Sequence, residues 1–183
     1  MSSTELLEAD FAHVHGGTCS FRADDVQASK DFRAEYATRS RLISPEDMPM
    51  ELCDDGLIKH LMHERFNSAE MCVDAYMQFI KPGGASGIHR HMWEEIIFVM
   101  DGEGHDLHWD MSYECAEEYH WSWEAEPKKY AWKRGDFIFI PPYSNHQHFA
   151  TGDKEARLIV ISNRIIKKMG MDWFEQVAPA PAD

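Results

Sequence analysis

Short apolar runs recur between residues 72 and 162, and turn-forming residues separate them. The runs lie at 72–80, 88–91, 95–100, 104–110, 130–133, 137–140, 146–149 and 157–162. The turn signals include Lys-Pro-Gly-Gly at 81–84, Asp-Gly at 101–102, Arg-Gly-Asp at 134–136 and Thr-Gly-Asp at 151–153. Short strands at regular spacing, punctuated by glycine and proline, are typical of an all-β sandwich or barrel.

The two ends of the chain carry helical patterns instead. Residues 24–40 place Val26, Phe32 and Tyr36 among good helix formers. Residues 165–169 resemble a helical turn, residues 171–177 are expected to form another, and the last residues a loose tail. The predicted organisation is a mainly helical N-terminal extension over 1–56, a barrel over 57–163, and a helical C-terminal segment with a loose tail over 164–183.

The charge of the chain argues against two classes of partner. Its 183 residues fit a single domain, and 18 Lys and Arg against 32 Asp and Glu give a net charge of −14. Because there is no basic cluster, we expect neither nucleic acid nor a membrane surface as partner. The apolar runs are too short to span a bilayer, and the acidic N-terminus lacks a signal-peptide pattern, so we expect a cytoplasmic protein.

Three residues of the run around 88–100 share one face of the predicted strand. His89 and His91 are two positions apart, and Glu95 has the same parity if the strand is continuous, whereas Glu94 points away. Two imidazoles and a carboxylate on one face suit iron, manganese, nickel or zinc. A third imidazole can come from His146, at the start of another strand.

These residues resemble the two sequence motifs of the cupins. The first motif is matched at every position, by Gly83, His89, His91, Glu95 and Gly102. The second is matched at Gly135, Pro141 and His146, but Tyr143 replaces a glycine and Ala150 replaces an asparagine. The resemblance implies a double-stranded β-helix, the jelly-roll barrel of the cupins, with one divalent metal held by His89, His91, Glu95 and His146. The alternatives are histidines of a polar surface hairpin, or a site that no longer binds metal.

Several further residues are candidates for the pocket. His148, two residues after His146, is expected to face the same cavity, either as a proton donor or as a partner that orients a ligand. His105 and His108 have opposite parity, so at most one of them faces inward. The resemblance suggests substrate contacts from flanking positions, for which we name Tyr76, Gln78, Trp109 and Arg157.

Residues 103–134 form an aromatic-rich insertion between the two motifs. It contains four of the six tryptophans of the chain. We expect it to act as a lid whose aromatic side chains contact a planar substrate, or to lie in a subunit interface. The resemblance also implies a homodimer.

The resemblance supports two kinds of chemistry and one non-catalytic role. We expect an Fe(II) dioxygenase that acts on a small aromatic or enolisable substrate. The alternative is an oxygen-independent lyase, isomerase or decarboxylase that uses Mn, Ni or Zn as a Lewis acid. In either enzyme Glu95 and His148 are the residues expected to transfer protons. The second alternative is a cupin that binds a small molecule without converting it.

Overall fold

The computed structural model describes residues 19–69, 71–115 and 117–182. Residues 1–18, part of the expected N-terminal extension, lie outside this description. The chain divides into two compact units, one ending at Arg39 and the other beginning at Ser40. Within the described residues, no helix is both long and apolar enough to cross a membrane.

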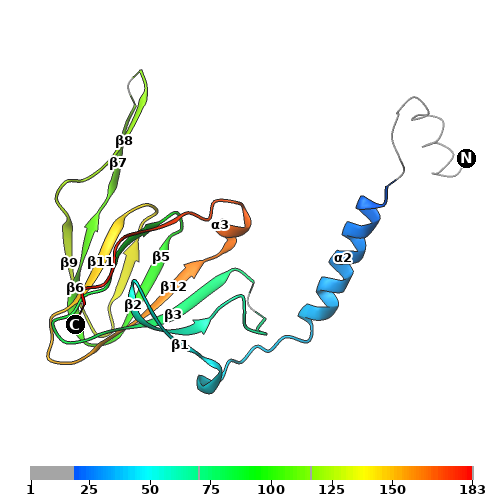
Figure 1. The fold of residues 1–183 in the computed structure, drawn as a ribbon, viewed down its shortest axis with the longest axis horizontal. Coiled ribbons are helices and arrows are strands. Elements are labelled where there is room, and N and C mark those ends of the chain that lie inside the picture. The colour runs from blue at the N-terminus through cyan, green and yellow to red at the C-terminus, as the bar shows by residue number, and fades with distance from the viewer. Residues whose placement is uncertain (1–18, 70, 116, 183) are drawn as a thin grey trace, which may run out of the picture. The chain divides into compact units, whose positions relative to one another are not determined.

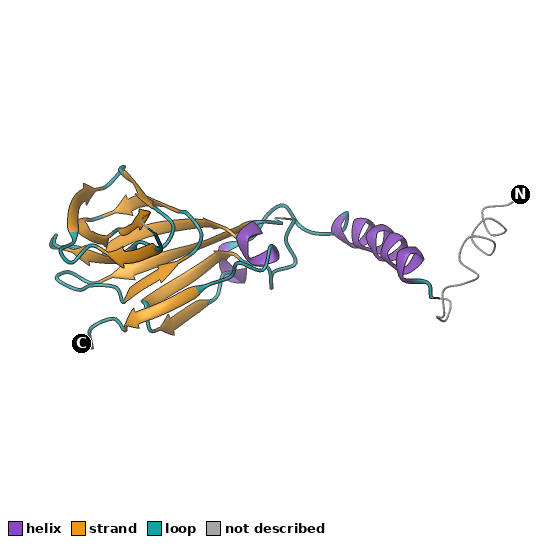
Figure 2. Ribbon diagram, turned by 90° about the horizontal axis from the view of Figure 1, so that it is seen from above, coloured by secondary structure: helices purple, strands orange, loops and turns teal. Residues whose placement is uncertain are grey.

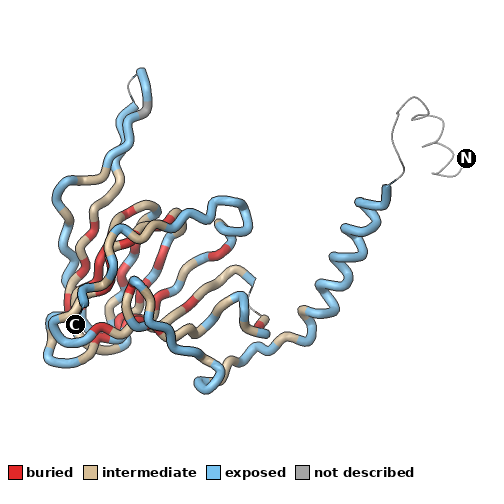
Figure 3. The backbone as a smooth tube through the Cα atoms, in the orientation of Figure 1, coloured by how far each residue is buried: buried red, intermediate tan, exposed pale blue. Residues whose placement is uncertain are grey.

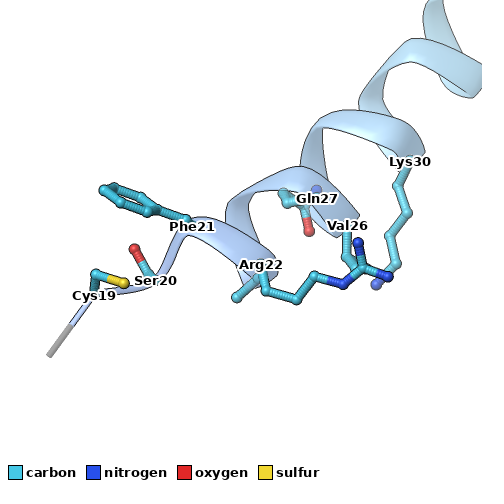
Figure 4. Close-up of a pocket in the computed structure, with 8 residues that line it drawn as sticks. Cys19, Ser20, Phe21, Arg22, Val26, Gln27 and Lys30 are labelled. Atoms are coloured by element: carbon cyan, nitrogen blue, oxygen red, sulfur yellow. The ribbon is translucent and has the colours of Figure 1, made fainter. Parts of the chain in front are cut away.

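The described part of the first unit, residues 19–39, contains the helix α2 (Phe21–Tyr36), where the amphipathic pattern predicts a helix. None of its residues is buried. Figure 4 shows its first turns, where Cys19, Phe21, Arg22, Val26 and Lys30 border a hollow on the helix surface. This hollow lies along one exposed helix, and we assign no function to it.

The second unit contains two antiparallel sheets, and it confirms the all-β prediction (Figures 1 and 2). In spatial order the six-stranded sheet contains β1 (Met50–Cys53), β2 (Gly56–Met62), β3 (Val73–Ile80), β12 (Ala156–Asn163), β5 (Glu95–Asp101) and β10 (Phe137–Ile140). The five-stranded sheet contains β13 (Phe174–Ala178), β4 (Ile88–His91), β11 (Asn145–Ala150), β6 (Glu103–Trp109) and β9 (Lys128–Lys133). The remaining elements are the hairpin β7 (Met111–Cys115) and β8 (Tyr119–Trp123), the 3-10 helix η1 (Pro45–Asp47) and the short helix α3 (Ile165–Lys168).

The apolar core is built from alternate residues of the strands. Ile97 of β5 lies opposite Ile138 of β10 on one side and Val160 of β12 on the other, and all three are buried. Trp132 of β9 joins this cluster from the other sheet. Figure 3 shows the resulting alternation of buried and less buried positions along the strands. This packing fixes the two sheets around the interior in which the histidines lie.

The turn predicted at Asp101-Gly102 is present between β5 and β6, but the two strands do not form a hairpin, because β5 pairs with β12 and β10 and β6 pairs with β11 and β9. Gly102 has a φ of +90°, and a Cβ atom added there would lie 2.8 Å from the Cα of Ala156. Both the left-handed backbone and the close approach therefore require glycine.

Two parts of the predicted organisation differ from the structure. Residues 171–177 were expected to be helical, but β13 spans Phe174–Ala178 and pairs with β4, with Phe174 opposite His91. The open edge of β4 outweighs the helix-like spacing of the apolar residues 171, 174 and 177. The tail is not wholly loose, because the N–H of Ala180 donates to the carbonyl of Asp54 at 2.6 Å. At the other end, β1 lies within the segment that was expected to be a helical extension.

Candidate metal centre

The four ligand positions of the motifs converge inside the barrel. His89 and His91 lie on β4, and His146 on β11 is directly opposite His89. The ring centroids of His89 and His146 are 4.2 Å apart, and those of His91 and His146 are 5.0 Å apart. Glu95 begins β5, and all four side chains are buried. The structure thus brings together residues from both motifs.

Each imidazole is oriented by an acceptor at its Nδ1 atom. Nδ1 of His91 lies 2.8 Å from the carbonyl of Trp93, and Nδ1 of His146 lies 2.9 Å from the carbonyl of Ser144. A proton on Nδ1 satisfies these acceptors and leaves the lone pair of Nε2 free for a metal ion. The Nε2 atoms of His91 and His146 are buried and have no hydrogen-bond partner among the described residues.

His89 is oriented by a carboxylate that the sequence did not indicate. Its Nδ1 lies 3.0 Å from Oδ1 of Asp55, in the turn between β1 and β2. Asp55 is held in turn by Gln78, whose Nε2 donates to the Asp55 carbonyl and to Oδ2, each at 2.9 Å. Gln78, named above as a substrate contact, therefore positions the partner of His89.

Glu95 completes the donor set. Its two carboxylate oxygens lie 3.4 Å from Nε2 of His91 and 3.9 Å from Nε2 of His146. Burial raises the pKa of Glu95, but the close contact and charge of His91 and the charges of the other imidazoles outweigh burial, so its pKa is lowered. The pKa of His146 lies well below its ordinary value because of burial and the neighbouring histidines. A deprotonated carboxylate and a neutral imidazole are the forms that bind metal.

This donor set fits a divalent transition metal. The ligand atoms of His89, His91 and His146 lie within 4.8 Å of one another, and the carboxylate of Glu95 adjoins them. Three imidazole nitrogens and one carboxylate suit iron, manganese, nickel or zinc. Without a metal, several of these polar atoms are buried and unpartnered, which is costly in a protein interior.

A second polar cluster adjoins the centre on β11 and β6. Nδ1 of His148 lies 2.9 Å from Oδ1 of Asp106, and the same oxygen accepts a hydrogen bond from Nε1 of Trp132 at 2.6 Å. His108 lies inward with its Nε2 3.5 Å from Oδ2 of Asp106, whereas His105 is only half-buried, as their parity predicted. Asp106 is a second residue that the sequence analysis did not single out.

The ion pair of His148 and Asp106 shifts the pKa of both residues. Burial lowers the pKa of His148, but the charge of Asp106 and the contact with it outweigh burial and raise the pKa to about 9. Burial raises the pKa of Asp106, but His148, His108 and Trp132 lower it to about 2. In the metal-free protein His148 is therefore a buried imidazolium.

The three other predicted substrate contacts, Tyr76, Arg157 and Trp109, do not lie together in the structure. Tyr76 is half-buried and packs against the apolar core, and burial together with the carboxylates of Glu95 and Asp55 raises its pKa well above the ordinary value. Arg157 lies on the outer face of β12, exposed, where it pairs with Glu155 at 3.2 Å. Trp109 has the opposite parity to the inward His108. The structure does not bring Arg157 or Trp109 to the histidines, because inward positions alternate along their strands.

The aromatic insertion, residues 103–134, contains β6, β7, β8 and β9. Nε1 of Trp123 donates to the carbonyl of Tyr143 at 2.9 Å. Together with three other side chains, these two residues line a hollow of about 380 Å³: Met111, Trp121, Trp123, Tyr143 and Trp173. A role of this hairpin as a lid or as an interface stays a prediction.

Comparison with known proteins identifies the family. Residues 44–180 match the model of the auxin-binding protein family. The chain belongs to the auxin-binding protein family. The match includes both β1 and β13, so these strands are part of the family domain. Auxin-binding protein 1 of Arabidopsis thaliana is 30% identical over 104 residues, which are 56% of this chain and 48% of the relative. The chain thus spans about half the length of that curated relative.

Solved structures of a bacterial cupin have the same fold as this member of the auxin-binding protein family. A tryptophan-to-tyrosine variant of oxalate decarboxylase from Bacillus subtilis superposes with a TM-score of 0.56 at 14% identity, covering 76% of this chain and 33% of that chain. A two-residue deletion variant of the same enzyme gives a TM-score of 0.57 at 14% identity, covering 76% and 32%. The resemblance to the cupins and the jelly-roll fold are confirmed.

Proposed function

We propose that this member of the auxin-binding protein family is a metal-dependent enzyme, whose centre binds one divalent ion through His89, His91, Glu95 and His146. The observation that carries the proposal is the orientation of the imidazoles. Each Nδ1 faces a carbonyl or carboxylate acceptor, so the Nε2 atoms are left for a metal. Surface histidines of a polar hairpin would be neither buried nor held in this way.

The substrate that we propose is a small organic compound with a carboxylate, phenol or enol oxygen. Such an oxygen is a good ligand for a divalent metal, and a three-histidine, one-carboxylate set leaves coordination positions open. The imidazolium of His148, held by Asp106, lies beside the centre and can donate a proton or a hydrogen bond to the bound oxygen. Glu95 is the second group proposed to take part in proton transfer.

The reaction that we propose is Fe(II)-dependent dioxygenation. An iron(II) ion in this centre would supply the activation of O2, with both oxygen atoms entering the product and the four electrons coming from the substrate. The protein supplies the buried environment, the orientation of the substrate and the proton at His148. Oxygen-independent chemistry with Mn, Ni or Zn is the competing outcome of the test.

Binding without reaction is a second candidate, which the family match favours. The relative from Arabidopsis thaliana is named for auxin binding, and the match covers 48% of its length. A carboxylate-bearing auxin such as indole-3-acetic acid would use the same metal and the same His148. A binding protein and an enzyme would therefore bind the ligand at the same site, and only turnover distinguishes them.

The test begins with metal-free protein reconstituted under argon with Fe(II), Mn(II) or Zn(II). Oxygen uptake by the Fe(II) form is measured with catechols, hydroxybenzoates, gentisate and 1,3-diketones. The expected result is uptake of one O2 per turnover, lost in His89→Ala and retained in Arg157→Ala. Carbon dioxide release from oxalate by the Mn(II) form without oxygen would favour the oxygen-independent alternative.

Three results would count against the enzyme. Calorimetric binding of indole-3-acetic acid to the Zn(II) form, with no turnover in any metal form, would identify a binding protein. Tight binding of one metal by His89→Ala/His146→Ala would refute the centre itself. Equal oxygen uptake by wild type and His89→Ala would show that the uptake does not come from this site.

We also propose that the protein acts as a homodimer through the outer face of its six-stranded sheet. Phe139, Ile96 and Ile161 form one row across β10, β5 and β12, and Phe137, Phe98 and Ile159 form the next. Phe137 is 71% exposed, Phe139 53% and Ile96 48%. Large contiguous apolar patches mark interaction sites. Because these rows contain no charge, two copies of an acidic chain can meet there, each using the same patch.

A further inference from the structure

His148 has the surroundings of a metal ligand, although neither cupin motif specifies a residue at its position. It is fully buried on β11, two residues after His146, so the two side chains share a face. Its Nδ1 faces Asp106 at 2.9 Å, and Asp106 is fixed by the indole N–H of Trp132 at 2.6 Å. Both ring nitrogens of His148 are buried and neither makes a hydrogen bond to a described residue, so the contact of Nδ1 with Asp106 is that of an ion pair.

This arrangement repeats the one around the motif ligand His89. Nδ1 of His89 faces the carboxylate of Asp55 at 3.0 Å, and Asp55 is fixed by an N–H donor, the amide of Gln78, at 2.9 Å. In both cases a buried imidazole is oriented by a carboxylate, and the carboxylate is held by a neutral side-chain donor. Histidine ligands in metal sites are typically oriented in this way, which raises the basicity of the coordinating nitrogen.

The position of His148 permits coordination. A ligand nitrogen of His148, a ligand nitrogen of His146 and a carboxylate oxygen of Glu95 all lie within 4.8 Å of one another. The three motif histidines meet the same limit. His146 therefore belongs to two overlapping sets of donors, one completed by His89 and His91 and the other by Glu95 and His148.

We propose that His148 is a fifth protein ligand of the metal through Nε2, so that four imidazoles and one carboxylate surround the ion. This inference rests on the proposed metal centre. In a six-coordinate ion, five protein donors leave one position for an external ligand. A substrate that binds through two oxygens, or a substrate together with O2, must then displace His148. A ligand with a single metal-binding oxygen leaves His148 on the metal. His148 therefore acts as the proton donor proposed above only after a substrate has displaced it and its Nε2 has taken up a proton.

The experiment follows each histidine of the full-length, metal-free protein during addition of Zn(II). The protein is labelled with nitrogen-15 in its histidine rings, and long-range proton–nitrogen spectra report whether each ring nitrogen is protonated, free or metal-bound. His148→Asn assigns the signal of His148, and competition with a chelator measures the affinity. His105→Asn, at a half-buried position of β6, is the matched control.

The expected result is that four histidines acquire a metal-bound nitrogen with one equivalent of Zn(II). His148→Asn should show three and bind Zn(II) at least about tenfold more weakly, and Asp106→Asn should weaken binding by about 10- to 100-fold. The control His105→Asn should show four metal-bound histidines and bind Zn(II) with the wild-type affinity. The number of metal-bound histidines in the wild-type protein decides the proposal even if a variant fails to fold.

Two other results are distinguishable. Three metal-bound histidines in the wild type, with His148 still protonated at Nε2 and an unchanged affinity in His148→Asn, would overturn the proposal and leave the motif centre intact. No response of any histidine to Zn(II) would refute the metal centre on which the proposal rests.

Discussion

Loss of the Asp106 carboxylate should remove a specific pH dependence from the stability of the metal-free protein. The perturbation is Asp106→Asn, which keeps the shape of the side chain but removes its charge. In the wild type, Asp106 raises the pKa of His148 to about 9, against an ordinary value of 6.5. In the variant that cause is absent, and burial, which lowers the pKa of His148, is opposed only by the charges of Asp55 and Glu95.

The magnitude follows from the pKa values of the two partners. A rise from 6.5 to about 9 corresponds to about 3 kcal/mol, at about 1.4 kcal/mol per pH unit. The fall of the pKa of Asp106 from 3.8 to about 2 corresponds to about 2 kcal/mol. Both values describe one ion pair and are not added, so we expect the pair to contribute about 2 to 3 kcal/mol.

The sign is opposite for the two groups. The raised pKa of His148 means that its contribution is complete below about pH 6.5 and is lost as the pH rises through about 9. The lowered pKa of Asp106 means that its contribution is complete above about pH 4 and is lost as the pH falls through about 2. The stabilising window therefore lies between about pH 4 and pH 6.5.

The assay is urea unfolding of the EDTA-treated protein from about pH 4 to about pH 10. The free energy of unfolding of the wild type should fall by about 2 to 3 kcal/mol more than that of Asp106→Asn, because titrations elsewhere are common to both proteins. Parallel pH curves for the two proteins would refute the reasoning. A difference that appears only below pH 5 would assign the effect to a carboxyl group instead of His148.

Three further predictions concern the metal ligands, a close backbone contact and the outer face. His146→Ala should bind less than a tenth of an equivalent of metal by elemental analysis while keeping the β-sheet circular dichroism of the wild type. Gly104→Ala should lower the free energy of unfolding by at least about 3 kcal/mol or prevent folding, because its Cβ would lie 1.8 Å from the carbonyl oxygen of Phe149; thermal unfolding measures this. Phe137→Glu should halve the mass measured by light scattering, whereas Trp121→Glu, exposed on the β7–β8 hairpin, should not; a monomeric wild type would contradict the proposed dimer.

The motif ligands could be predicted from the sequence because their geometry is local. Two histidines two positions apart on a strand must share a face, and the structure places His89 and His91 inward as expected. The pairing of His146 with His89 is a long-range contact, which periodicity alone could not predict. The resemblance to the cupin motifs indicated that His146 joins His89 at the metal. The inward position of His108 rather than His105 required knowledge of which face of β6 is covered.

The residues that orient the ligands could not be predicted, because they come from distant parts of the chain. Asp55 precedes its partner Gln78 by 23 residues, and Asp106 precedes Trp132 by 26. Acidic residues are abundant in this chain, so nothing in the local sequence distinguishes these two from carboxylates on the surface. What distinguishes them is the pairing of the strands, which buries each carboxylate against an imidazole.

Tyr143 shows how the second motif can depart from the family pattern without the loss of a metal ligand. Its φ of +61° is the left-handed conformation that a glycine adopts without strain, and a bulky residue there costs about 1 to 3 kcal/mol. One contact that glycine would lack offsets this cost: the Tyr143 ring packs on Trp173 with centroids 4.9 Å apart. Two backbone hydrogen bonds also fix the turn, because the Tyr143 N–H donates to the carbonyl of His91 at 2.8 Å and the Tyr143 carbonyl accepts from Nε1 of Trp123 at 2.9 Å. The side chain that breaks the motif therefore packs on the segment before β13, while the backbone ties the aromatic insertion to the turn that leads into His146. A substitution at this position acts on the packing of Trp173 first and on the ligand only through the backbone.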